Sequence, residues 1–206
     1  MPATNFIVVE GTDDRHVILH IAQAHDLKYK RDFEFTEDIE GVDQLLRSLS
    51  TLIWDKSDSR FAIVIDADFD IKARWTAVRN RLRSCGYEPP SEIGPEGALF
   101  EGSNLPCVGV WLMPDNGSPG MLEHFLGQMV PEEDRLWDQA QAVVDSLTDR
   151  RFPESQEFKA KIHTWLAWQR EPGRPYGVAV RSGLFDAKSA SADAFIAWLK
   201  RVFDLP

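Results

Sequence analysis

The chain has 206 residues, of which 43% are hydrophobic and 27% are charged, and its formal net charge is −10 at pH 7. This length suits one α/β domain or a compact domain with a helical extension, and this composition excludes a disordered chain. So negative a charge excludes a protein that coats nucleic acid by bulk attraction. It does not exclude a metal enzyme that acts on nucleic acid, because bound cations offset carboxylates locally.

The sequence contains no signal for a membrane. No apolar run approaches the roughly 18 residues that a membrane-spanning helix needs. The first residues, MPATNFIVVEG, lack a basic segment followed by a long apolar one, so we expect no signal peptide. Cys85 and Cys107 do not have the spacing of metal ligands, and we expect both to be reduced and packed. These features predict a cytoplasmic protein.

The first part of the chain alternates between two kinds of apolar pattern. Short apolar or β-branched runs predict strands, and apolar residues spaced by three and four predict helices. The expected order is a strand at 6–9, a helix at 13–27, a strand at 32–37, a helix at 42–52, a strand at 60–68, a helix at 71–82, a strand at 108–113 and a helix at 120–129. This alternation predicts an α/β fold with a mostly parallel four-stranded sheet flanked by helices.

After Pro131 the pattern becomes helical throughout. We expect helices at 136–147, 157–171 and 192–205, with no linker long enough to free them from the rest. The predicted organisation is therefore an α/β domain at 1–130 and a helical extension at 131–206, packed on the same domain.

Acidic residues gather where the predicted strands end. The stretch FAIVIDADFD is an apolar strand that runs into carboxylates at alternate positions, and other strands also end near acids. The carboxyl ends of parallel strands meet at one rim, which is where ligands of such sheets bind. Carboxylate oxygens suit Mg²⁺, so a cation would make the crowding tolerable. The candidate ligands of Mg²⁺ or Mn²⁺ are Glu10, Asp14, Asp66, Asp68, Asp70, Asp115 and Glu123. Asp70 suits a helix N-cap equally well.

Other motifs fit these residues less well. The calcium loop of an EF-hand needs Gly and Glu where Ile71 and Ala77 stand. Haloacid-dehalogenase-type phosphatases have Thr or Val at the place of Asp70. His16 and His20 have a helical spacing that can bind zinc, but no third ligand is evident. No GxxxxGK[ST], GxGxxG or GxSxG string occurs, which removes the commonest nucleotide-loop and serine-hydrolase interpretations.

The pair IVVEGTDD and FAIVIDADFD resembles the Toprim domain of topoisomerases, primases and OLD-family nucleases. That pattern is a strand ending in Glu-Gly, followed by a later strand ending in Asp-x-Asp. DADFD is similar to the form in type II topoisomerases, and EGTDD is more similar to the nuclease branch. MPDNGSPGMLE resembles small, stand-alone, uncharacterised Toprim-like proteins. The resemblance covers residues 6 to 126, and nothing resembles the ATPase domain of OLD proteins or the tyrosine-bearing domain of topoisomerases.

The resemblance implies roles for the acidic residues. Glu10 would be a general acid/base or a metal ligand, and Asp66 and Asp68 would hold Mg²⁺; these three are the candidate catalytic residues. Asp70 would be an outer ligand. A second metal position, as two-metal phosphoryl transfer requires, would be completed by Asp14, Asp115 and Glu123. Lys161 or Lys188 could assist the transition state.

The expected function is metal-dependent hydrolysis of phosphodiester bonds, as a nuclease on DNA or RNA. The alternatives are a non-catalytic metal-binding adaptor or regulatory subunit and a phosphatase on small molecules. Nucleic acid is the expected substrate. The resemblance also implies a separate partner for targeting, such as an ATPase of a bacterial defence system, and an oligomer is compatible with the sequence.

Overall fold

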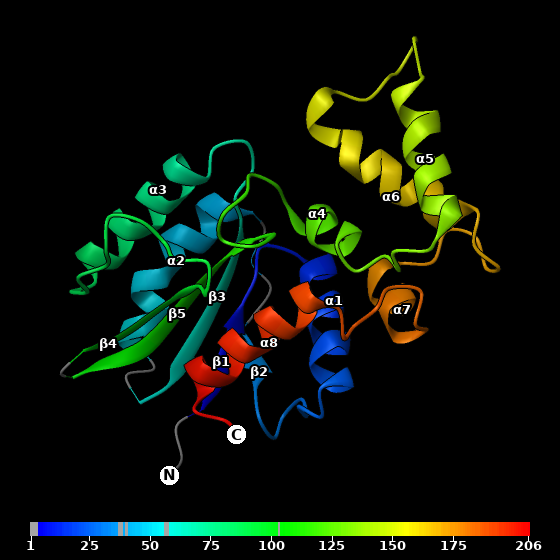
Figure 1. Cartoon of the computed structure of the whole chain (residues 1–206). Coiled ribbons are helices and arrows are strands. Elements are labelled where there is room, and N and C mark those ends of the chain that lie inside the picture. The colour runs from blue at the N-terminus through cyan, green and yellow to red at the C-terminus, as the bar shows by residue number, and fades with distance from the viewer. Residues whose placement is uncertain (1–3, 37–38, 40, 56–57, 103) are drawn as a thin grey trace.

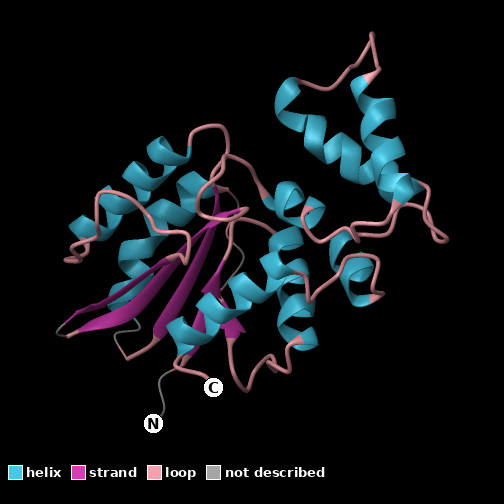
Figure 2. Cartoon of the chain, viewed as in Figure 1, coloured by secondary structure: helices cyan, strands magenta, loops and turns pink. Residues whose placement is uncertain are grey.

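The computed structural model describes residues 4–36, 39, 41–55, 58–102 and 104–206. Within these residues the chain forms one sheet of five strands in the order β2-β1-β3-β5-β4 (Figures 1 and 2). The strands are β1 (Asn5–Val8), β2 (Glu34–Phe35), β3 (Arg60–Asp66), β4 (Ala98–Gly102) and β5 (Leu105–Met113). β1, β2, β3 and β5 pair in parallel, and β4 pairs antiparallel with β5. The predicted α/β class with a mostly parallel sheet is confirmed.

The helices follow the predicted alternation. They are α1 (Thr12–Ala24), α2 (Val42–Asp55), α3 (Ile71–Ser84), α4 (Leu122–Gly127), α5 (Arg135–Asp145), α6 (Glu157–Ala167), α7 (Tyr176–Arg181) and α8 (Ala190–Phe203), with a 3-10 turn at Glu154–Gln156. None of the helices in the described part of the chain is both long enough and apolar enough to cross a membrane.

The sheet is covered on both faces because its inner strands are apolar at successive positions. Alternate residues of β3 point to opposite sides, so Ala62 and Val64 join the cluster under α1 and α8, while Ile63 and Ile65 join the cluster under α2 and α3. A Cβ at Gly109 of β5 would stand 2.2 Å from a methyl carbon of Val202. Glycine at this position therefore lets α8 lie directly on the sheet.

The elements predicted from the sequence differ from those of the structure in a few places. β4 was not predicted, so the sheet has a fifth, antiparallel edge strand. The strand predicted at 32–37 is only two residues long, and residue 37 lies outside the described residues. α7 is a further helix that the sequence pattern did not indicate.

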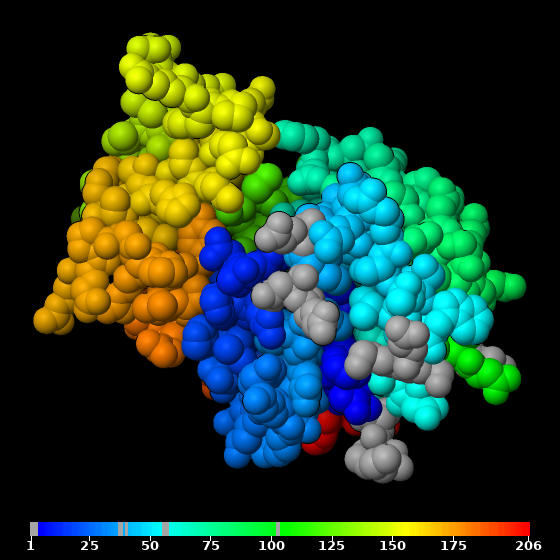
Figure 3. Space-filling model, turned by 180° about the vertical axis from the view of Figure 1, so that it is seen from behind, coloured from blue at the N-terminus to red at the C-terminus, as the bar shows by residue number. Residues whose placement is uncertain are grey.

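The residues after Pro131 have two different positions. α8 covers the sheet beside α1, whereas α5 and α6 form a helical pair that projects past the carboxyl ends of the strands (Figure 1). In the view from behind, this pair and the α3 side of the molecule stand as two lobes with a notch between them (Figure 3). The helical pair α5 and α6 therefore borders the carboxyl ends of the strands on one side.

Candidate active site

β1 and β3 are neighbouring parallel strands, so the residues that follow them meet at the same rim. Glu10 follows β1, and its Oε1 accepts a hydrogen bond of 2.8 Å from the backbone N–H of Asp66, the last residue of β3. Burial raises the pKa of Glu10, although that hydrogen bond and the charge of Arg74 oppose the shift. Glu10 thus holds a proton more readily than an exposed glutamate does.

Asp14 lies in the first turn of α1, one turn beyond Glu10. A Cβ at Gly11, the N-cap residue of α1, would stand 3.3 Å from Oδ2 of Asp14, so this carboxylate folds back over the Glu-Gly turn. Burial and then the neighbouring charge of Glu10 raise the pKa of Asp14 to about 7. At neutral pH this carboxyl is therefore only partly ionised.

Asp66 and Asp68 lie on either side of a sharp turn after β3. Oδ1 of Asp66 accepts a hydrogen bond of 3.0 Å from the N–H of Leu122 at the start of α4. Burial and the charges of Asp14 and Glu10 raise the pKa of Asp66 well above its usual value. Asp68 has a positive φ of 53° and its carboxylate pairs with the guanidinium of Arg74.

Glu123 adds a buried carboxylate from α4. Its Oε1 lies 2.9 Å from Nζ of Lys159 on α6 and 3.3 Å from the hydroxyl of Tyr176, which also contacts Nε2 of His163 at 3.0 Å. Burial and the adjacent Glu123 raise the pKa of Tyr176, so its hydroxyl stays protonated and donates to the carboxylate.

Asp14, Asp66, Asp68 and Glu123 line a hollow of about 430 Å³, whereas Glu10 is not among its lining residues. The hollow is lined by Gly11, Thr12, Asp13, Asp14, Asp66, Asp68, Met121, Leu122, Glu123, Gln156 and Lys159. Within the described residues, the cations that pair with its carboxylates are Lys159 and Arg74. Negative charge is therefore in excess at this rim, and after burial, the larger cause, it raises the pKa of Asp14 and Asp66.

Sequence analysis missed both of these cations. Lys159 reaches the hollow from a helix predicted only as part of the extension. Lys161, proposed from the sequence, instead pairs with Asp145 at 2.7 Å and Glu157 at 3.0 Å. Lys188 does not line the hollow. Helical spacing could have separated Lys159 from Lys161, but the sequence does not show which face of the helix meets the strands.

The structure does not bring Asp70 and Asp115 into this hollow. Asp70 caps α3, where its side chain accepts a 2.9 Å hydrogen bond from the N–H of Ala73. Asp115 closes the loop after β5 by accepting hydrogen bonds from the N–H groups of Gly117 and Ser118 at 3.0 and 2.7 Å. Burial opposes the effect of these bonds, but together they lower the pKa of Asp115. Both carboxylates have local structural partners.

A protein-family model described as "Protein of unknown function (DUF3226)" matches residues 4–204. The chain belongs to the DUF3226 family. The match spans every residue of the hollow, including Lys159 on the helical pair. No curated protein and no solved structure matches the chain. The description of DUF3226 states no activity, so function must be argued from the geometry of the site.

The donor set of this DUF3226 chain fits one class of metal ion better than others. Among the described residues, no three His, Cys, Asp or Glu side chains stand in a group that could hold an ion by themselves. This arrangement does not fit a closed zinc site, which takes four protein ligands. Mg²⁺ commonly takes one or two carboxylates and fills its other positions with waters and phosphate oxygens, so Asp66 and Asp68 are the carboxylates that would hold such an ion here.

Proposed function

We propose that this DUF3226 protein is a Mg²⁺- or Mn²⁺-dependent phosphodiesterase, specifically a Toprim nuclease that acts on DNA or RNA. The observation that carries the proposal is the excess of buried carboxylates at the rim, where Glu10, Asp14 and Asp66 have raised pKa values and lack a matching number of cations. Buried like charges are costly unless a cation binds among them. The Toprim resemblance of the β1 and β3 motifs supports the same assignment.

In this proposal Asp66 and Asp68 would hold the ion, and Asp14 and Glu123 line the same hollow. The ion, when bound, supplies positive charge to the phosphate and lowers the pKa of water. Glu10 takes up or returns a proton, a role that suits a carboxyl whose pKa is raised by burial. Lys159 contributes a further positive charge beside Glu123, at the side of the hollow that faces α6.

The direct test is cleavage of plasmid DNA and of a long RNA, with Mn²⁺, with Mg²⁺ and with EDTA. We expect cleavage of at least one polymer in the presence of either ion and none in EDTA. Hydrolysis of a generic phosphomonoester, without cleavage of either polymer, would instead point to the small-molecule phosphatase.

A second candidate is a non-catalytic metal-binding adaptor. It is supported by apolar side chains exposed on and just after α5, which are Leu136, Val143 and Leu147 at 39, 45 and 46%. Such a surface suits a protein partner. An adaptor would be stabilised by Mn²⁺ without cleaving DNA or RNA. Targeting by an ATPase of a bacterial defence system is supported by the Toprim resemblance alone.

A further inference from the structure

Positive charge is concentrated on one helix of this acidic protein. α3 has the sequence IKARWTAVRNRLRS, which contains five basic residues and no acidic one, whereas the whole chain has a net charge of −10. The basic residues are Lys72, Arg74, Arg79, Arg81 and Arg83. A local field opposite in sign to the net charge attracts anions to this part of the surface.

The helical repeat separates these cations into two rows. Trp75, Val78 and Leu82 are buried against the sheet. Lys72, Arg79 and Arg83 are spaced by seven and four residues, so they share one face beside the buried row. Arg74 and Arg81, also seven apart, flank the buried row on the other side, toward α2. We use the name α3 surface for the first row together with two further arginines, Arg81 of α3 and Arg47 of α2.

The first row of the α3 surface is available for a ligand. Within the described residues, no carboxylate forms an ion pair with Lys72, Arg79 or Arg83. Nη1 of Arg79 donates to the carbonyl of Ser91 at 3.2 Å, but its buried Nε has no hydrogen-bond partner. Arg79 lines a hollow of about 530 Å³ between α3 and the loops at 91–93 and 116–117. The Arg79 guanidinium therefore keeps its positive charge at this hollow, whose lining also includes Lys72 and the acid Glu92.

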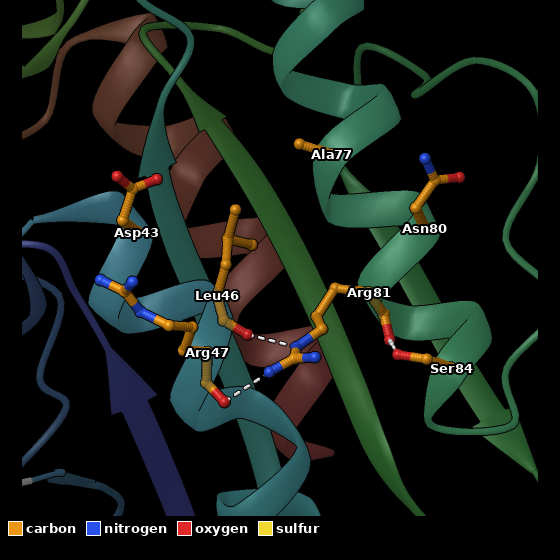
Figure 4. Close-up of a pocket in the computed structure, with 7 residues that line it drawn as sticks. All are labelled: Asp43, Leu46, Arg47, Ala77, Asn80, Arg81 and Ser84. Atoms are coloured by element: carbon orange, nitrogen blue, oxygen red, sulfur yellow. Dashed lines mark hydrogen bonds between the residues drawn. The ribbon is translucent and has the colours of Figure 1, made fainter.

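The second side of the α3 surface lies in a hollow of about 510 Å³ between α2 and α3 (Figure 4). Nε and Nη2 of Arg81 donate to the carbonyls of Leu46 and Arg47 at 2.5 and 2.6 Å, and these bonds hold α3 against α2. Because these carbonyls are neutral, the hydrogen bonds do not cancel the positive charge of the Arg81 guanidinium. Arg47 is exposed at the edge of the same hollow, where Asp43 is the single acid among the lining residues.

The α3 surface begins at the acidic hollow. α3 starts three residues after Asp68, and its Arg74 pairs with that carboxylate. The N–H of Gly41, just before α2, donates to the carbonyl of Glu10 at 3.0 Å. The 14 residues of α3 extend about 20 Å at about 1.5 Å per residue. That length corresponds to roughly six phosphates of one strand of B-DNA.

We infer that the α3 surface binds the phosphate backbone of a nucleic acid and guides the strand into the acidic hollow. This inference rests on the proposed nuclease function. A row of cations along one helix suits a phosphate chain, because each cation contacts a phosphate independently of base sequence. An anionic membrane is tested as the alternative below, since no large apolar side chain is exposed on α3 itself but Phe69, two residues before it, is 72% exposed.

The test measures binding in EDTA, where the proposed reaction cannot proceed. A fluorescently labelled DNA duplex, a single strand of the same sequence and the matching RNA are titrated at several low NaCl concentrations. The variant Lys72→Gln, Arg79→Gln, Arg83→Gln is compared with the wild type. Its control is Arg135→Gln, Arg151→Gln, Arg181→Gln, which removes equal charge from exposed positions on other elements. We expect the α3 variant to lose affinity tenfold or more at low salt, and the control to change little.

The salt dependence gives a second, quantitative readout. Loss of three phosphate contacts should reduce the slope of log K against log salt by about 2.7 on duplex or about 2.1 on single strands. If Arg79→Gln unfolds the protein, the pair Lys72→Gln, Arg83→Gln tests the same surface, because neither side chain holds another element.

Two results would overturn the inference. One is an equal loss of affinity in the α3 variant and in the control. That result would mean that binding depends on the net charge of the protein and not on the α3 surface. The other is wild-type protein that binds none of the oligonucleotides at low salt, whether or not it binds phosphatidylserine vesicles or an acidic protein. Binding that depends on α3 in EDTA, together with no cleavage in Mn²⁺, would support the surface and reject the nuclease.

Discussion

Asp68 and Gly120 exchange two backbone hydrogen bonds, each 2.7 Å long, which tie the turn after β3 to the loop before α4. This bridge holds Asp68 at its positive φ of 53° and places Asp66 and Asp68 next to the start of α4. The position of the candidate metal ligands therefore depends on a residue that carries no side chain.

Gly120→Ala should disturb this bridge. Gly120 has a φ of 149°, and a Cβ there would stand 2.9 Å from Cγ of His124 and 3.0 Å from Cδ of Pro114. We expect a loss of more than about 1 kcal/mol in the free energy of unfolding, measured by urea denaturation. Gly117→Ala is the control, since the nearest atom to its Cβ would be 3.6 Å away. Equal stability of the two variants would contradict the role of the bridge.

Mn²⁺ should stabilise the folded protein. An ion that binds only the folded state adds RT ln(1+[L]/Kd) to the free energy of unfolding, which is about 2.7 kcal/mol at a hundredfold excess over Kd. The measurement is the melting temperature in EDTA and in millimolar Mn²⁺. A melting temperature that does not respond to either Mn²⁺ or Mg²⁺ would count heavily against a metal site at this rim.

Asp68→Asn and Glu10→Gln should separate chemistry from folding. Both changes remove a charge and keep a hydrogen-bond acceptor, and Asn tolerates the left-handed conformation of residue 68. We expect the metal-free stability of Glu10→Gln to hold or rise, because repulsion falls, and that of Asp68→Asn to change little, because it loses both repulsion and its ion pair with Arg74. Cleavage should drop by about 100-fold or more in both.

The matched controls for this pair are Asp138→Asn and Glu133→Gln, at exposed positions on and near α5. They should cleave at the wild-type rate. Asp13 is less suitable as a control because it lines the hollow. Cleavage by the Asp68 and Glu10 variants at the rate of the controls would reject the assigned roles.

The stability of the metal-free protein should fall as the pH rises toward 7. The pKa of Asp14 is raised from 3.8 to about 7, so between these values the folded protein binds more protons than the unfolded chain. The free energy of unfolding therefore decreases with pH across this range. Melting in EDTA from about pH 5 to about pH 8 tests this, and Asp14→Asn should flatten the profile. A wild-type profile as flat as that of Asp14→Asn would show that Asp14 has an ordinary pKa.

Lys159→Gln should reduce cleavage while leaving metal binding intact. Its ammonium lies beside Glu123 in the hollow, and without it less positive charge faces the phosphate. We expect a loss of roughly tenfold or more in rate, with an unchanged or larger rise in melting temperature on addition of Mn²⁺. The control is Lys161→Gln. Lys161 is on the same helix but pairs with Asp145 and Glu157, so this variant should cleave at the wild-type rate. Equal rates in the two variants would exclude a role for Lys159.

The parts of the fold that were predictable share a strong local pattern. β3 and β5 are continuous apolar runs, and α1 and α3 have apolar residues at helical spacing. β4 was missed because a short antiparallel edge strand between glycines gains its stability from β5 and not from its own residues. α7 was missed because it is short, and most of its six residues are buried by packing against α1.

The candidate site was also predictable only where the sequence pattern is local. Strand order alone brings Glu10 and Asp66 together, since each follows one of two neighbouring parallel strands. Asp70 and Asp115 also follow strands, yet Asp70 caps α3 and Asp115 closes its own loop. Lys159 enters from a distant helix. Caps and tertiary contacts of this kind depend on three-dimensional packing, which a one-dimensional pattern does not contain.

The position of α8 also limits how this protein can fold while it is being synthesised. The strands are complete well before α8 is translated, but the face that Trp198 and Val202 cover stays bare until α8 leaves the ribosome. Exposed apolar strand surface is prone to aggregation and is what chaperones protect. A ribosome that stalls between β5 and α8 would therefore leave a nascent chain with an open sheet face, and cellular quality control would act on it.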